Sequence, residues 1–181
     1  MTAAAEPWPG TLLGRSQDAS HRRRVAAFCF VTAALLLPAG YLAGRYHLAI
    51  DPQLVRCLPE IRAVLIDRLG HPRQPGELVV FEAHGLAPAF PDGTLLVKRL
   101  AALPGDRIDV SPQGLQVNGE LVAPGLALAG KLGHQPADFT RSYQVPPDHF
   151  LALGTHELSL DGRYYGPLPD TLQRGSATIL F

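Results

Sequence analysis

The sequence predicts a mainly β, antiparallel domain that is anchored by a single N-terminal transmembrane helix. Two observations lead to this fold class. One segment, 25–43, contains no Asp, Glu, Lys, Arg or His, whereas proline and glycine interrupt the remainder of the chain every several residues. The short apolar runs between these interruptions have the length and composition of strands joined by turns. The 181 residues therefore divide into an N-terminal segment 1–24, a membrane helix 25–43 and a β domain 44–181.

The apolar segment has the length of a membrane span. Its 19 residues, VAAFCFVTAALLLPAGYLA, are enough for a helix that rises about 1.5 Å per residue to cross a bilayer core. His21 and Arg22–Arg24 precede the segment directly, and only Arg45 follows it closely. The positive-inside rule therefore places the N-terminus in the cytoplasm and the β domain on the outer, periplasmic side of the inner membrane.

Two other interpretations of this segment remain open. A cleaved secretory signal also combines basic residues with an apolar stretch, and Pro38-Ala39-Gly40 loosely resembles its small-residue ending. However, the 24 residues that precede the stretch are long for the basic region of a signal. A buried helix of a soluble domain would show an apolar stripe with a 3.6-residue period, and this segment is apolar throughout.

The β domain is predicted from segments of strand-like composition. Residues 44–53 are expected to form a short tether. Strands are expected at 63–67, 77–82, 94–100, 106–110, 114–117, 120–122 and 150–154. Asn118-Gly119 separates two alternating segments and supplies the positive φ angles of a type I′ turn, which predicts an antiparallel hairpin. Residues 123–144 show no clear period and are expected to form an inserted loop, in which one short helix is an option.

Lys98 stands out because it lies inside an apolar run, LLVKRLAA. In a strand, Lys98 would share one face with Leu96 and Leu100, so its ammonium group would lie between leucines. Burial disfavours the charged form of lysine, and a neutral lysine can act as a general base. The alternative is a lysine on an edge strand, whose charge reaches solvent and blocks pairing with other chains. This stretch alone leaves both interpretations open.

Composition argues against several classes of function. The formal net charge is zero and no basic groove is visible, so we expect no nucleic-acid partner. The histidines beyond the apolar segment are scattered without ligand spacing, and no Cys-x-x-Cys accompanies them, so we expect no metal and no cofactor. Cys29 falls in the expected span and Cys57 beyond it, so the two are not expected to pair. Cys57 is then either a small buried hydrophobe or a thiol kept for its chemistry.

Three stretches carry a family resemblance: RCLPEIRAVLID at 56–67, VKRLAALPGD at 97–106 and GTHELSLDGRYYGPL at 154–168. Together they resemble the signal peptidase I family of membrane-anchored Ser/Lys endopeptidases, and within it the TraF-type peptidases of conjugative transfer systems. The second stretch resembles the family's lysine box, in which Lys-Arg is followed by Pro-Gly-Asp. The third is similar to the last box, although Thr155-His156 replaces Asp-Asn and Gly162 replaces a serine. The first places Cys57 where the family carries its nucleophilic serine.

The resemblance implies a catalytic dyad in which Cys57 is the nucleophile and Lys98 takes its proton. Ser159 would hydrogen-bond the lysine and orient it. Asp161 and Arg163 would form a structural ion pair beneath the site. A thiol is more acidic than a hydroxyl, so the resting dyad is either two neutral groups or a thiolate with an ammonium.

The oxyanion of the tetrahedral intermediate also needs hydrogen-bond donors. The backbone N–H of Cys57 is the first. Some relatives use a hydroxyl two residues before the nucleophile, and here Val55 occupies that position. A second donor therefore has to come from another backbone N–H.

By this resemblance we expect a membrane-bound endopeptidase that cleaves a leader or tail from an exported protein, such as a conjugative pilin or another transfer-system precursor. The expected partners are this protein or peptide substrate and membrane lipid. The competing hypothesis is a non-catalytic, membrane-anchored component of a conjugation or secretion apparatus that kept the fold after losing the serine. A housekeeping signal peptidase of broad specificity is a third possibility, disfavoured by the short chain.

Overall fold

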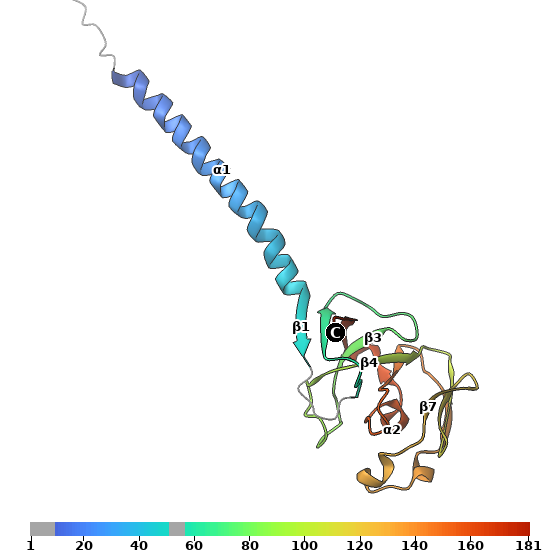
Figure 1. Cartoon of the computed structure of the whole chain (residues 1–181). Coiled ribbons are helices and arrows are strands. Elements are labelled where there is room, and N and C mark those ends of the chain that lie inside the picture. Colours follow the sequence, from blue (N-terminus) through green and yellow to red (C-terminus); the bar gives the residue numbers. More distant parts are fainter. Residues whose placement is uncertain (1–9, 51–56) are drawn as a thin grey trace, which may run out of the picture. The chain divides into compact units, whose positions relative to one another are not determined.

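The computed structural model describes residues 10–50 and 57–181, with side chains from residue 19 onward, so Val55 lies outside the described residues. The chain divides into two compact units, one ending at Gly44 and the other beginning at Arg45. The first unit contains helix α1, Gly10–Arg45, whose 36 residues include Pro38 and the whole apolar segment (Figure 1).

Helix α1 is long and apolar enough to cross a membrane. Its span Ala19–Arg45 contains a window with mean hydropathy 2.0, and none of that window is buried against protein. Large apolar side chains such as Phe28, Phe30 and Leu37 are more than 70% exposed, at 72%, 74% and 72%. An exposed apolar surface of this kind requires an apolar environment such as lipid.

The second unit is built from two antiparallel sheets (Figure 1). The larger sheet has seven strands in the order β1-β2-β11-β3-β4-β9-β10. Their bounds are β1 Tyr46–Ile50, β2 Ala63–Asp67, β3 Leu78–Glu82, β4 Leu95–Ala102, β9 His149–Leu153, β10 Leu168–Pro169 and β11 Gln173–Ile179. The smaller sheet has the order β7-β6-β5-β8, with β5 Arg107–Ser111, β6 Gly114–Val117, β7 Glu120–Pro124 and β8 Arg141–Gln144. The mainly β, antiparallel class predicted from the sequence is confirmed.

All seven expected strands are present, and their ends agree with the prediction to within two residues. The Asn118-Gly119 hairpin is also confirmed. It joins β6 to β7, with φ angles of 51° at Asn118 and 88° at Gly119. The Asn118 side chain strengthens this turn, because its oxygen accepts from the backbone N–H of Arg107 at 2.9 Å and its nitrogen donates to Asp106 at 2.8 Å.

The expected tether at 44–53 is wrong for its described part. Residues Tyr46–Ile50 form strand β1, which pairs with β2 along its whole length. A bidentate ion pair between Arg45 and Asp67, with Nε–Oδ1 at 2.9 Å and Nη2–Oδ2 at 2.6 Å, fixes the start of this pairing. The sequence gives no alternation of apolar and polar residues here because β1 is a sheet edge with mostly exposed side chains.

The expectation of an inserted loop at 123–144 with one short helix is also wrong. The segment contains two short 3₁₀ helices, η1 Ala129–Leu132 and η2 Pro136–Phe139, and it ends in strand β8. Strand β8 pairs with β5, and Phe139 packs edge-to-face on Tyr164 with ring centroids 5.1 Å apart. The segment is therefore an ordered part of the smaller sheet and its core.

Strand β11 was not predicted, although it lies near the centre of the larger sheet between β2 and β3. Its sequence, QRGSATI, is polar, and a bulge between Gln173 and Gly175 breaks any regular alternation. Strand β11 thus pairs with β2, which follows the Cys57 stretch, on one side and with β3 on the other. Strand β3 in turn pairs with β4, which carries Lys98.

We predict that Gly119→Ala destabilises the β domain by about 1–2 kcal/mol, because a Cβ in the left-handed region is strained even though nothing lies within 4 Å of it. Gly130→Ala is the matched control, since Gly130 also has open space around it but no positive φ angle. That change should be neutral or slightly stabilising. Urea unfolding of the two purified variants checks the prediction, and equal midpoints would contradict it.

Candidate active site

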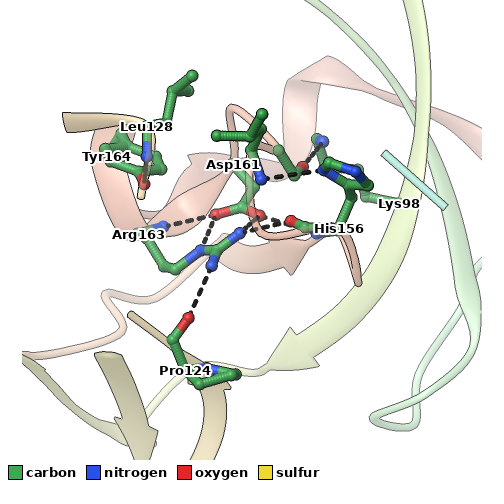
Figure 2. A network of polar contacts seen from close by, with 10 residues as sticks. Lys98, Pro124, Leu128, His156, Asp161, Arg163 and Tyr164 are labelled. Carbon is green, nitrogen blue, oxygen red and sulfur yellow. Dashed lines mark hydrogen bonds and ion pairs between the residues drawn. The ribbon is translucent and has the colours of Figure 1, made fainter. Parts of the chain in front are cut away.

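Lys98 is fully buried in the middle of the larger sheet. Its strand, β4, pairs with β3 on one side and β9 on the other, so the edge-strand interpretation is wrong. Lys98 has 0% exposure and shares its face with Leu96 and Leu100, at 8% and 2%. Its Nζ donates to the hydroxyl of Ser159 at 2.8 Å (Figure 2). The structure therefore brings together Lys98 and Ser159, as the family resemblance implied.

The loop that follows β9 carries Ser159 and approaches the Cys57 turn closely. A Cβ on Gly154 would collide with the hydroxyl of Ser159 and would lie 2.7 Å from the carbonyl oxygen of Cys57. Only glycine permits this approach of the two segments. Within the loop, the N–H of Ser159 donates to the carbonyl oxygen of His156 at 3.0 Å.

An ion pair between Asp161 and Arg163 fixes the position of this loop (Figure 2). Arg163 Nε and Nη2 donate to the two oxygens of Asp161 at 2.9 and 2.8 Å, and the side chains are 2% and 0% exposed. Arg163 also donates to the carbonyl oxygens of Pro124 at 3.2 Å and His156 at 3.1 Å. Asp161 accepts from the N–H of Gly154 at 3.0 Å. The pair thus joins the loop to the end of β7.

The charges of this pair stabilise each other against the cost of burial. Desolvation opposes the ionisation of Arg163, but the hydrogen bonds and the negative charge of Asp161 outweigh it and raise the pKa of Arg163 above its ordinary value. A buried pair with saturated hydrogen bonds remains ionised, and removal of either partner leaves an uncompensated charge.

Cys57 is half-buried and lines a cavity that Lys98 also lines. Its carbonyl oxygen accepts from the N–H of His156 at 3.1 Å, and the following residue, Leu58, is buried. A cavity of about 290 Å³ is lined by both Cys57 and Lys98. The remaining lining is Ala49, Ile50, Leu58, Ile61, Arg62, Val64, Phe90, Thr94, Leu95, Leu96 and Val97. The cavity is thus largely apolar, with the thiol and the amine among its few polar groups.

Thr155 and His156, which depart from the family box, have hydrogen-bond roles of their own. The Thr155 hydroxyl donates to Glu60 at 2.9 Å, and His156 Nδ1 accepts from the N–H of Leu158 at 3.0 Å. Glu60 also pairs with Arg99 at 3.0 Å. Sequence reasoning missed Glu60, and no local signal points to it, because its partners lie 39 and 95 residues away.

Two tyrosines near the site, Tyr164 and Tyr165, have raised pKa values. Burial, and to a smaller extent the negative charge of Asp161, raise the pKa of Tyr165 well above its ordinary value. Burial likewise raises the pKa of Tyr164, whose hydroxyl oxygen accepts from the N–H of Leu128 at 3.0 Å. Both phenols therefore stay protonated near neutral pH.

No group of three or more His, Cys, Asp or Glu side chains that could hold a metal ion occurs among the described residues 10–50 and 57–181. The chemical groups that the site offers are thus a thiol, a buried amine and a hydroxyl. This combination is suited to nucleophilic attack with proton transfer.

Comparison with known proteins identifies the class to which this fold and site belong. Residues 22–181 match the family described as signal peptidase, peptidase S26. The match spans most of the chain, so the chain belongs to the S26 signal peptidase family. This membership supports a peptidase, and hence a hydrolase.

The individual proteins that this chain resembles include a conjugal transfer protein. The chain is 31% identical over 172 residues to "Conjugal transfer protein TraF" of Agrobacterium tumefaciens (strain 15955), a match that covers 83% of this chain and 91% of that protein. It is 32% identical over 115 residues to "Probable signal peptidase I-2" of Synechocystis sp., covering 63% of this chain but only 50% of that protein. A crystal structure of a signal peptidase I from Enterococcus faecalis V583 overlaps with 60% of this chain and 99% of that one, at 21% identity and a TM-score of 0.39. An overlap at this level says nothing about the site.

We predict that Arg163→Met destabilises the β domain by about 3–5 kcal/mol, because the carboxylate of Asp161 is left buried without its counter-charge. The control is Arg174→Met, which removes the exposed partner of Glu82 and should change stability little. Urea unfolding curves of the two variants check this difference. Similar unfolding midpoints would show that the Asp161 pair is not a structural support.

Proposed function

We propose that the chain is a membrane-anchored endopeptidase of signal peptidase type, in which Cys57 is the nucleophile and Lys98 is the general base. The observation that carries the proposal is the shared cavity: a buried lysine, oriented by Ser159, lines the same apolar space as the thiol. A lysine with 0% exposure in a central strand is costly to keep. A role in the chemistry accounts for this lysine better than a role as a structural cation, since no salt bridge within residues 10–50 and 57–181 includes it.

The reaction begins when the Cys57 proton passes to Nζ of Lys98 and the thiolate attacks the carbonyl carbon of the scissile peptide bond. The tetrahedral intermediate collapses as Lys98 returns the proton to the leaving amine, which leaves a thioester on Cys57. Lys98 then takes a proton from water, whose oxygen attacks the thioester, and the thiol is restored. Ser159 keeps Nζ in place through these steps by its hydrogen bond.

Two resting states of the dyad are compatible with this scheme. In the first, both Cys57 and Lys98 are neutral. In the second, a thiolate supplies the counter-charge for a buried ammonium, which fits the lack of any carboxylate salt bridge to Lys98 in the described part of the chain. Either state delivers a thiolate to the carbonyl carbon.

The substrate that we propose is an exported precursor, such as a conjugative pilin or another transfer-system protein. The TraF relative supports this choice, because its name places it in conjugal transfer. The apolar lining of the cavity suits uncharged side chains next to the cleaved bond. Helix α1 would span the inner membrane with a cytoplasmic N-terminus, so that the β domain acts at the lipid surface on the periplasmic side.

The alternative is a non-catalytic component of a conjugation or secretion apparatus. One observation favours it: Cys57 stands where the family carries serine. The two proposals differ in what they require of Lys98, because a protein without catalysis has no use for a lysine poised against a thiol.

We predict that Lys98→Ala abolishes processing of a co-expressed conjugative pilin precursor, because it removes the amine that accepts the Cys57 proton in the proposed dyad. Lys131→Ala, which removes an exposed lysine on η1, is the matched control and should process normally. Cys57→Ala should be inactive, whereas Cys57→Ser should keep partial activity. The size shift of the precursor on gels reports the result, and cleavage by Lys98→Ala would exclude the dyad.

A second prediction needs no substrate. In the full-length protein with Cys29→Ala, iodoacetamide should alkylate Cys57 on the order of tenfold faster than it does in the Lys98→Ala variant, because the lysine favours the reactive thiolate. Mass spectrometry of the intact protein gives the rate. Equal rates would show that the two groups are not coupled and would favour the non-catalytic alternative.

A further inference from the structure

A set of polar contacts outside the Lys98–Ser159 pair fixes the turn that carries Cys57. The two carboxylate oxygens of Glu60, three residues after the cysteine, have different partners. Oε1 accepts from Arg99 Nη2 at 3.0 Å, and Oε2 accepts from the hydroxyl of Thr155 at 2.9 Å. Glu60 therefore ties the turn to two separate elements.

Those two elements hold Lys98, the other member of the dyad, and Ser159, its hydrogen-bond partner. Arg99 follows Lys98 directly on β4, and its Nη1 also donates to the carbonyl oxygen of Gly76 at 3.2 Å, which restrains the guanidinium. Thr155 lies in the loop that carries Ser159. Any displacement of the Cys57 turn relative to Lys98 and Ser159 must therefore stretch a contact of Glu60.

Few other polar contacts in the described residues serve this turn. The carbonyl oxygen of Cys57 accepts from the N–H of His156 at 3.1 Å, and the N–H of Ile61 closes the turn on the carbonyl oxygen of Leu58 at 3.0 Å. These bonds fix the backbone of the turn, but neither involves a side chain that reaches β4. Among the described residues, the contact between Glu60 and Arg99 joins the turn to β4.

The charge on Glu60 is maintained by its partners. Burial opposes ionisation, but its own backbone N–H, the Thr155 hydroxyl and the Arg99 guanidinium outweigh it and hold the pKa of Glu60 below its ordinary value. The ion pair is therefore formed at neutral pH. Its side chains are 33% and 42% exposed, so it contributes little to global stability, and its effect is confined to local geometry.

We propose that Glu60 is a positioning residue, which acts through Arg99 and Thr155 to hold the thiol of Cys57 against Lys98. This inference rests on the proposed dyad. It assigns to the turn a function in catalysis beyond that of supplying the nucleophile.

The test measures alkylation of Cys57 by iodoacetamide in the detergent-solubilised full-length chain, with Cys29→Ala in every variant. Glu60→Ala should slow alkylation about fivefold and Arg99→Ala by no more than this, because Arg99→Ala leaves the contact between Glu60 and Thr155 in place. The double variant should be no slower than Glu60→Ala, in which the contact with Arg99 is already lost. In the Lys98→Ala background, Glu60→Ala should have no further effect. This dependence on Lys98 distinguishes positioning from a change in the exposure of the thiol.

The matched control is Glu82→Ala, which removes another exposed ion pair between distant segments of the same sheet, Arg174–Glu82 at 2.8 Å. Its alkylation rate should equal that of the parent. Glu60→Gln, which keeps an oxygen for Thr155 but loses the charge for Arg99, should lie between Glu60→Ala and the parent. This milder variant preserves the test if Glu60→Ala unfolds.

Three results would overturn the proposal. If Lys98→Ala slows alkylation but the Glu60 variants do not, the positioning role is excluded and the dyad stands. If Glu60→Ala has the same effect with and without Lys98, Glu60 only shields the thiol. If Lys98→Ala itself has no effect, the dyad fails, and the role of Glu60 in it fails too.

Discussion

Arg163 Nη2 and Asp161 Oδ2 lie 2.8 Å apart in a region from which solvent is excluded, and the geometry of the site depends on this one ion pair. Asp161 binds the N–H of Gly154 at the start of the loop, while Arg163 binds the carbonyl oxygens of His156 within the loop and of Pro124 at the end of β7. Replacing either partner with a neutral side chain would leave the other one charged and buried without its counter-charge. The pair therefore fixes the loop between Gly154 and Asp161, and with it the hydroxyl of Ser159 that orients Lys98.

The sheet determines where Lys98 lies, and the loop determines how its amine is oriented. Strand β4 lies between β3 and β9, so its inward face is closed to solvent over its whole length. An amine on that face can leave the core only at a cavity, and the cavity that it lines also contains Cys57. Gly154 permits the loop and the turn to approach within contact distance. Backbone contacts thus hold together the three segments, distant in sequence, that carry Cys57, Lys98 and Ser159.

The sequence predicted the strands with regular alternation and the Asn118-Gly119 turn, because those signals are local. It did not predict β1, β8 or β11, whose side chains are largely polar or half-exposed and whose pairing depends on partners elsewhere in the chain. The residues Lys98, Ser159, Asp161 and Arg163 stood out through family boxes. Glu60 belongs to no such pattern. Its importance arises from contacts 39 and 95 residues away, which only the folded structure brings together.

The two ion pairs of the site differ in burial. We therefore expect loss of the buried pair to affect the stability of the fold and loss of the exposed pair to affect the local geometry of the site. The Asp161–Arg163 pair is buried, so its loss would affect the whole β domain as well as the loop. The Glu60–Arg99 pair is a third to two-fifths exposed, at 33% and 42%, so water can replace much of its interaction when it breaks. A contact of that kind cannot be retained for stability alone. Because it joins the cysteine turn to the strand of the lysine, a small gain in local order would act on the distance between thiol and amine, on which the proposed proton transfer depends.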